Sequence, residues 1–133
     1  FYRKFYSNFE YRPPCSNKNI QKIMLKHDAL ILPSIVEGRA LVQQEALACG
    51  LPIIVTPNAG GIDLVKEGVT GYLVSIRSPQ DISCKISMLI ESRNDLPEIR
   101  KSCRKKAACY NWQDYSQAII NLNSTLDKTN YIK

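Results

Sequence analysis

Two short, uninterrupted apolar runs are the clearest strand signals in the sequence, residues 29–32 (Ala-Leu-Ile-Leu) and residues 52–55 (Pro-Ile-Ile-Val). Runs that are continuous rather than alternating are typical of strands covered on both faces. Residues 40–49 between them predict a helix, which Gly50 can end in the left-handed conformation. The order strand, helix, strand predicts a right-handed βαβ unit with parallel strands.

The same alternation continues toward the carboxyl end. Residues 71–75 (Gly-Tyr-Leu-Val-Ser) predict a third strand, and a short helix over residues 62–66 is expected before it. Ser78, followed by Pro79 and an acid in the first turn, predicts the start of another helix. Apolar residues then recur at helical spacing, at Ile82, Ile86, Leu89 and Ile90.

Weaker signals predict the remaining elements. A helix is expected from about Pro97, and Asn111 can cap a last helix. We interpret residues 9–12 as a strand and residues 20–26 as a short helix, and we expect the tail from Lys128 to fray. Strands that alternate with helices predict the α/β class, with a doubly wound parallel sheet. Apolar residues on one face of the last helix are Trp112, Tyr115, Ile119, Leu122 and Leu126. We expect Trp112 to pack within the protein rather than to stack on a substrate.

The charge pattern narrows the choice of partners. The chain of 133 residues has a formal net charge of +6, and five basic residues lie between Arg100 and Lys106 with no acid among them. Their spacing suits one solvated helix face, with contact to anionic lipid as the alternative. No nucleic-acid-binding motif accompanies the cluster, so we expect no nucleic-acid partner.

Cysteine usage and hydropathy indicate the compartment. Five cysteines occur without a C-x-x-C pair, so neither a zinc site nor a disulfide framework is expected. Reduced thiols favour the cytosol, and the apolar runs are too short to cross a bilayer. We expect a cytoplasmic protein, with peripheral contact at the inner face of the membrane as an alternative. The chain starts at Phe1 rather than at a methionine, which suggests a piece of a longer protein.

The candidate chemistry lies in residues 33–52 (PSIVEGRALVQQEALACGLP). This stretch starts at the carboxyl end of a predicted strand, where open α/β sheets bind ligands, and then enters a helix. The first N–H groups of a helix lack partners and, together with the helix dipole, favour an anion such as a diphosphate. Gly38 would let a ligand approach the backbone closely.

Two acids in this stretch, Glu37 and Glu45, are eight residues apart. On one helix they would lie about 80° apart around the axis and about 12 Å apart along it, which does not suit a paired acid–base dyad. We therefore expect Glu37 in the loop before the helix and Glu45 inside the helix, each meeting a different part of one extended ligand. Ionised carboxylates suit sugar and ribose hydroxyls because they accept two hydrogen bonds.

The wider motif set resembles a known family. The E-x7-E pattern from Glu37 to Glu45 stands within P-S-x-x-E-G-x-x-L-x-x-x-E-A-x-A-C-G-L-P, followed by Gly60-Gly61, by G-x-x-G-Y-L-V at residues 68–74 and by Tyr-Asn-Trp at residues 110–112. This set is similar to the C-terminal domain of the family-four, or group 1, glycosyltransferases. The likeness is clear from about residue 27 to residue 74 and looser to about residue 122.

The resemblance implies an architecture, the donor-binding C-terminal domain of a GT-B enzyme. The chain would be a single partial domain forming its distal half, with strands 4, 5 and 6 of the order 3-2-1-4-5-6 and residues 9–12 as strand 3. Its parts would be a donor-site core at residues 9–76, C-terminal helices at residues 77–127 and a tail at residues 128–133. Unpaired strand edges would leave the isolated chain marginally stable or prone to self-association.

The resemblance also implies a function, retaining transfer of a sugar from a UDP- or GDP-type donor without a metal or other cofactor. An acceptor glycan or glycolipid would be held by a separate N-terminal domain. The residue matching Glu45 would hold the ribose hydroxyls, and the residue matching Glu37 would act as the catalytic residue near the donor sugar. The sugar and β-phosphate would face Gly38, Arg39, Ala40 and Leu41.

Two departures from the family pattern leave questions open. Arg39-Ala40 replaces the common Phe-Gly, and Ile62-Asp63 follows the two glycines where Pro-Glu is usual. Arg39 would either add charge near the diphosphate or point to solvent. Two alternatives to an active transferase remain: an inactive homologue that binds nucleotide sugars, and a Rossmann-like domain of a sugar-nucleotide epimerase. A dehydrogenase is disfavoured because G-x-G-x-x-G is missing.

Overall fold

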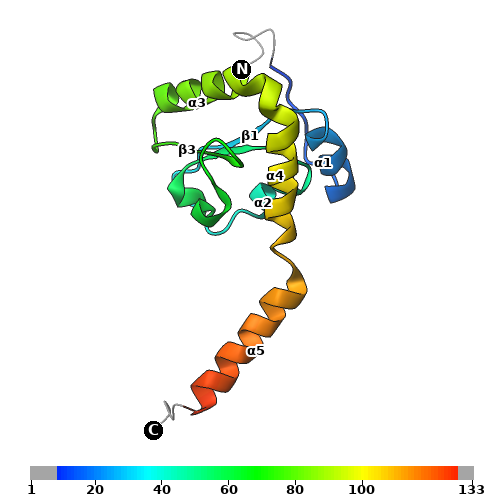
Figure 1. Cartoon of the computed structure of the whole chain (residues 1–133), viewed down its shortest axis with the longest axis vertical. Coiled ribbons are helices and arrows are strands. Elements are labelled where there is room, and N and C mark those ends of the chain that lie inside the picture. Colours follow the sequence, from blue (N-terminus) through cyan, green and yellow to red (C-terminus); the bar gives the residue numbers. More distant parts are fainter. Residues whose placement is uncertain (1–8, 129–133) are drawn as a thin grey trace.

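A parallel sheet with helices on both faces organises the chain (Figure 1). The computed structural model describes residues 9–128. In chain order the helices and strands are α1 (Asn17–Met24), β1 (Leu30–Leu32), α2 (Leu41–Ala48), β2 (Ile53–Val55), β3 (Gly71–Leu73), α3 (Pro79–Glu91), α4 (Leu96–Ala108) and α5 (Trp112–Lys128). Short 3-10 turns lie at Pro57–Ala59, Ile62–Leu64 and Ser92–Asp95.

The strands lie in the order β1-β2-β3 and run parallel, with Leu30 opposite Ile53 and Ile53 opposite Gly71. Helix α2 connects β1 to β2, so the predicted βαβ unit and the α/β class are confirmed. Among the described residues β1 pairs only with β2, and Ile31 on it is 41% exposed. Self-association through this edge stays a prediction.

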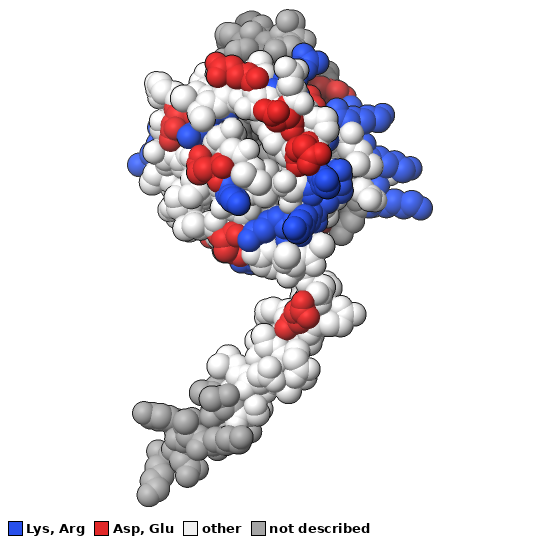
Figure 2. Space-filling view, in the orientation of Figure 1, with Lys and Arg blue, Asp and Glu red and all other residues white. Residues whose placement is uncertain are grey.

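Helix α5 extends away from the layered body (Figure 1). Figure 2 shows charged side chains spread over the body, whereas the visible face of α5 carries few. The expectation that Trp112 packs is wrong for the described residues, because Trp112 is 74% exposed and its ring meets Tyr115 edge-on. The expected tail at residues 128–133 lies outside the described residues, apart from Lys128, which ends α5.

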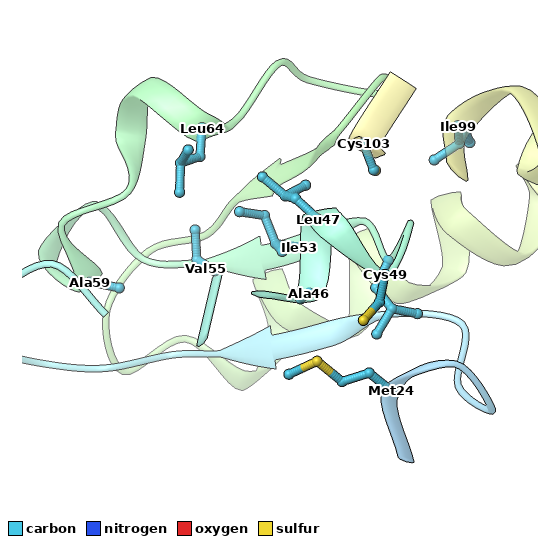
Figure 3. Packing of buried hydrophobic residues seen from close by; sticks show 11 residues of the cluster. Met24, Ala46, Leu47, Cys49, Ile53, Val55, Ala59, Leu64, Ile99 and Cys103 are labelled. Carbon is cyan, nitrogen blue, oxygen red and sulfur yellow. The ribbon is translucent and has the colours of Figure 1, made fainter. Parts of the chain in front are cut away.

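The side chains of β2 alternate between two apolar layers. Ile53 and Val55 enter a core with Leu47 of α2 and Cys103 of α4 (Figure 3). Ile54 points to the other face, which packs against Ile82, Ile86 and Leu89 of α3. Both faces of the strand are therefore covered, which explains its continuous apolar run. Burial raises the pKa of the Cys103 thiol to about 11.

Helix α2 ends as the sequence predicts. Gly50 has a φ of 81° and donates its N–H to the carbonyl of Leu47 at 2.9 Å. Leu51 donates to the carbonyl of Ala46, also at 2.9 Å. These two bonds form a Schellman motif, in which a left-handed glycine lets the chain satisfy the last carbonyls and turn back into β2.

The predicted amino-terminal caps of α3 and α5 are also present. The Ser78 hydroxyl accepts the Asp81 N–H at 3.3 Å, with Pro79 at the first helical position. The Asn111 side-chain oxygen accepts the Asp114 N–H at 2.8 Å. Each cap satisfies a backbone donor that has no partner within its helix.

Two expectations near the amino end and one near the middle need correction. Residues 9–12 form no strand; Pro13 and Pro14 follow directly, and proline cannot donate to a strand ladder. The helix expected at residues 20–26 is α1, which begins and ends earlier, at Asn17 and Met24. The helix expected at residues 62–66 is only a 3-10 turn, Ile62–Leu64.

Truncation of the core should be far more costly than the same truncation on the surface of α2. Leu47 is fully buried and Leu41 is 56% exposed on the same helix. Leu47→Ala should lower the free energy of unfolding by about 2–5 kcal/mol, whereas Leu41→Ala should change it by less than about 1 kcal/mol. Chemical denaturation of both variants measures the difference. Equal losses would contradict the assigned core.

Candidate functional site

The residues singled out by sequence lie at the carboxyl end of β1. The β1–α2 loop, residues 33–40, leaves this end and leads directly into α2. The loop that follows β2, residues 56–70, leaves the same edge of the sheet because the two strands are parallel. This edge is where open α/β sheets place ligands.

Hydrogen bonds join the β1–α2 loop to the loop after β2. The Glu37 N–H donates to the carbonyl of Asn58 at 3.2 Å, and the Asn58 side-chain amide donates to the carbonyl of Ile35 at 2.8 Å. The buried Thr56 hydroxyl donates to the carbonyl of Ser34. The loop backbone is therefore held from several sides, although most of its side chains are exposed.

Gly60 lies where the two loops come closest. It has a φ of 69°, and a Cβ there would meet the Gly38 carbonyl oxygen at 2.3 Å. At Gly61 a Cβ would meet the side-chain oxygen of Gln43 at 1.9 Å. Gly60 is thus required by a close backbone approach, and Gly61 leaves room for the Gln43 side chain, which refines the tight turn expected from sequence.

Gln43 is the buried polar residue beneath this contact. Its amide donates to the carbonyl of Ala59 at 2.6 Å, and its side-chain oxygen has no hydrogen-bond partner among the described residues. The side chain is fully buried in the first turn of α2. Gln43 therefore fixes the start of α2 against the segment after β2.

Glu37 lies in the loop before α2, as expected. Its side chain is exposed, and one carboxylate oxygen accepts the Ser34 hydroxyl at 2.7 Å. This bond orients the carboxylate without burying it. Next to it, a Cβ on Gly38 would meet nothing within 4 Å, and Val36 is 86% exposed. Nothing in the described chain covers this part of the loop, so a ligand can approach it.

The amino-terminal tip of α2 is not capped by a side chain. Ala40 occupies the cap position in an extended conformation and is buried, while Leu41 opens the helix on the exposed side. The first amide groups of a helix attract an anion through their unpaired N–H groups and the helix dipole. The tip is therefore suited to a negatively charged group.

Glu45 lies in the second turn of α2, exposed, on the same face as Leu41 and Ala48. It borders a cavity of about 190 Å³ between α1 and α2, lined also by Ile20, Gln21, Met24, Ala48 and Cys49. The expected placement of Glu37 in the loop and Glu45 inside the helix is thus observed. A second cavity, of about 340 Å³, lies between residues 12–15 and α1, and no residue of the β1–α2 loop lines it.

The Arg39 side chain is partly exposed and pairs with an acid from the loop after β2. Its guanidinium forms two hydrogen bonds to the Asp63 carboxylate, at 3.1 and 3.0 Å, and lies 5.3 Å from the centre of the Tyr110 ring. The Tyr110 hydroxyl donates to the same carboxylate at 2.7 Å. We call these residues the Arg39–Asp63–Tyr110 cluster.

The protonation states in this cluster follow from its contacts. Hydrogen bonding to Asp63 raises the pKa of Arg39, against the opposing effect of burial. Partial burial of the Asp63 carboxyl raises its pKa, but hydrogen bonds from Arg39 and Tyr110 outweigh this, so the net pKa is lowered. Both groups are charged at neutral pH, and Asp63 neutralises Arg39.

Other chemistry-bearing residues lie elsewhere. The ring of His27 contacts the Ile23 carbonyl through Nδ1 at 2.7 Å, at the end of α1. Arg100, from the basic cluster, pairs with Asp28 at 2.9 Å. No group of three potential metal ligands occurs among residues 9–128, and within the same range no helix is long and apolar enough to cross a bilayer.

Four residues of the site were not predicted from sequence to lie there: Gln43, Asn58, Asp63 and Tyr110. Asp63 had been noted only as a departure from the family pattern. The contact could have been predicted only by matching the charge of Asp63 with that of Arg39, the other departure. The two residues are 24 positions apart, so no local pattern connects them. Gln43 and Asn58 carry no local signal, because amides on a helix or in a loop are usually solvated.

An open helix tip at the carboxyl edge of a parallel sheet is where α/β folds commonly place anionic ligands. Comparison with known proteins gives the family: the model of the glycosyl transferases group 1 matches residues 7–121. The chain belongs to this family. A D-inositol 3-phosphate glycosyltransferase of Paenarthrobacter aurescens is 30% identical over 115 residues, which are 86% of this chain and 28% of that protein.

Other relatives agree with this assignment. Sucrose-phosphate synthase 4 of Arabidopsis thaliana is 35% identical over 91 residues, covering 68% of this chain and 9% of that protein. The solved structure of Alr3699/HepE of Anabaena in complex with UDP has a TM-score of 0.69 at 24% identity, over 78% of this chain and 29% of that one. Sucrose-phosphate synthase of Thermosynechococcus elongatus has a TM-score of 0.65 at 24% identity, over 77% of this chain and 26% of that one.

These structural likenesses confirm the expected GT-B type of fold. The chain spans less than a third of the curated relatives it matches, between 9% and 28% of the lengths of those described here.

Adding a methyl group at Gly60 should disrupt the contact between the two loops. Gly60→Ala places a Cβ against the Gly38 carbonyl, so it should destabilise the protein by about 1–3 kcal/mol more than the matched control Gly68→Ala. Gly68 has a similar φ, 71°, but its nearest atom would be 4.0 Å away. Chemical denaturation measures both variants, and equal losses would show that the close approach is unimportant.

The Asp63 carboxylate should make stability depend on acid pH. Its folded-state pKa is lowered, so its contribution is present above the unfolded-state pKa of about 4 and is lost as the pH falls through the lower folded value. Between pH 7 and pH 3, the free energy of unfolding should therefore fall less in Asp63→Asn than in the wild type. Glu91→Gln, which leaves the Arg39–Asp63 pair intact, is the comparison variant.

Proposed function

We propose that this chain supplies the donor-binding site of a retaining glycosyltransferase. The observation that carries the proposal is the uncapped tip of α2, flanked by the loop acid Glu37 and the helical acid Glu45. A nucleotide sugar offers a diphosphate between two sets of hydroxyl groups. Its chemistry matches an anion-binding tip between two carboxylates.

Each residue has a proposed role. Glu45 accepts hydrogen bonds from the ribose hydroxyls, and Glu37 contacts the donor sugar as the catalytic residue. The backbone of Gly38, Ala40 and Leu41 faces the sugar and the β-phosphate, which the helix tip stabilises as it departs. Because Arg39 is paired with Asp63, its side chain is not assigned to the diphosphate.

A UDP- or GDP-type nucleotide sugar is the proposed donor, without a metal or cofactor. The UDP complex of the structural relative Alr3699/HepE supports a UDP-type donor over a GDP-type donor. The acceptor, a glycan or glycolipid, would bind to a part of the enzyme outside this chain. An inactive homologue that binds nucleotide without transferring sugar is the second candidate. The match to a transferase family does not favour the epimerase alternative.

A cytoplasmic location, with peripheral membrane contact as an alternative, completes the proposal. Basic side chains gather over α4 and along α1 in Figure 2, where anionic lipid could meet them. Within the basic cluster, Arg100 is already engaged by Asp28, which favours a structural role for that residue.

Nucleotide binding by the intact protein tests the proposal. Glu45→Ala should raise the Kd for UDP or GDP about tenfold or more, since a hydrogen bond to a charged group is lost. Glu98→Ala, an exposed acid on α4, is the control and should leave the Kd unchanged. Glu37→Gln should lower kcat with little change in donor Kd. Unchanged affinity in Glu45→Ala would remove its role, and nucleotide binding without any transfer would favour the inactive homologue.

A further inference from the structure

We propose that Asp63 and Tyr110 are positioning residues for the donor site: through Arg39 they hold the β1–α2 loop and the tip of α2 in the shape that binds the nucleotide diphosphate. This inference rests on the proposed function. It gives Arg39 a mechanical role in place of direct contact with the ligand.

The cluster joins three parts of the chain. Arg39 is the penultimate residue of the β1–α2 loop, Asp63 lies in the 3-10 turn after Gly60-Gly61, and Tyr110 follows α4. Each member touches the other two, through the paired guanidinium–carboxylate bonds, the phenol–carboxylate bond and the guanidinium over the ring. Three mutual contacts fix a position better than one ion pair does.

The location of Arg39 explains why its position matters. The earlier part of the loop is held by Thr56 and Asn58, which bind the carbonyls of Ser34 and Ile35. Nearer to α2, the backbone bond from Ala40 to Ala59 is long, at 3.4 Å. Arg39 is the residue immediately before the helix cap. Its side-chain bonds to Asp63 therefore restrain the segment that must face the ligand.

The energetics favour a positioning role over a stabilising one. The Arg39 and Asp63 side chains are 41% and 49% exposed, and exposed ion pairs contribute little to folding. A group that fixes a binding loop can still matter for affinity, because a displaced helix tip loses its alignment with the phosphates. The lowered pKa of Asp63 and the raised pKa of Arg39 agree with a persistent pair.

The pairing also connects the two departures from the family pattern. Arg39 opens the first departure and Asp63 closes the second, and the two side chains bond to each other. If only one of the two charged residues were present, it would lack the partner that the other provides across the two loops. The charged pair therefore links the two segments in which the departures occur.

The test measures nucleotide affinity in the intact protein. Asp63→Asn and Tyr110→Phe should each raise the Kd for the better-bound of UDP and GDP by about three- to tenfold. Glu98→Gln removes an exposed partner of Lys101, and Tyr115→Phe removes a phenol oxygen on α5; both controls should match the wild type. Tyr110→Phe keeps the ring in place, so it guards against a failure to fold.

A second measurement separates positioning from stability. Without nucleotide, amide hydrogen exchange of residues 37–41 should be faster in Asp63→Asn and Tyr110→Phe than in the wild type, with only the small fall in the free energy of unfolding that loss of an exposed ion pair allows. A merely stabilising role would lower that free energy and leave the Kd of the folded protein unchanged. Unchanged exchange together with unchanged affinity would overturn the proposal.

The double variant Arg39→Gln/Asp63→Asn tests whether the two residues act as one unit. We expect its Kd to equal that of whichever single variant, Arg39→Gln or Asp63→Asn, binds the nucleotide less tightly, because either change alone already breaks the cluster. If Arg39 instead binds the diphosphate directly, Asp63→Asn should release it and strengthen UDP binding, which would overturn the positioning role. An increase in Kd in the double variant equal to the product of the two single increases would also overturn the positioning role, because the two residues would then act independently.

Failure of the proposed function has a separate signature. If the wild type binds neither UDP nor GDP, the donor-site assignment fails, and hydrogen exchange alone then decides on the cluster. Faster exchange of residues 37–41 in the variants would retain Asp63 and Tyr110 as positioning residues of this loop, and unchanged exchange would reject them.

Discussion

The contact between Gly60 and the Gly38 backbone is the constraint on which the candidate site depends. Two loops leave the same sheet edge and come so close that Gly60 cannot carry a Cβ, which would meet the Gly38 carbonyl oxygen. Buried Gln43 fills the space under this contact and ties the first turn of α2 to Ala59. The direction of the helix tip therefore follows from loop packing as much as from the sheet.

Local patterns predicted most of the fold. Continuous apolar runs gave β1 and β2, and residues 71–75 gave β3. Gly50, Ser78 and Asn111 marked helix ends through bonds to nearby backbone groups. Such signals act within a few residues, so they can be read without knowing the fold. The assignments of residues 9–12 and of Trp112 failed because pairing and packing need a partner elsewhere, which no local pattern specifies.

The site was predicted less completely. The loop position of Glu37 and the helical position of Glu45 followed from their spacing, and the open helix tip followed from the order of strand and helix. The partner of Arg39 did not, because Asp63 and Tyr110 come from distant segments and meet it only after the sheet has formed. Sequence thus indicates which groups can bind a ligand, whereas the contacts that hold those groups depend on tertiary structure.

The distribution of cysteines has a consequence for oxidative conditions. Cys15, Cys84 and Cys109 are exposed, whereas Cys49 and Cys103 are buried. Thiolates are the reactive form, and burial keeps both inner thiols protonated by raising their pKa. Sulfenic acid or mixed disulfides with small thiols would therefore form at the surface first, leaving the packing between α2, α4 and the sheet intact. The platform that carries the candidate site is chemically shielded from an oxidant that modifies the periphery.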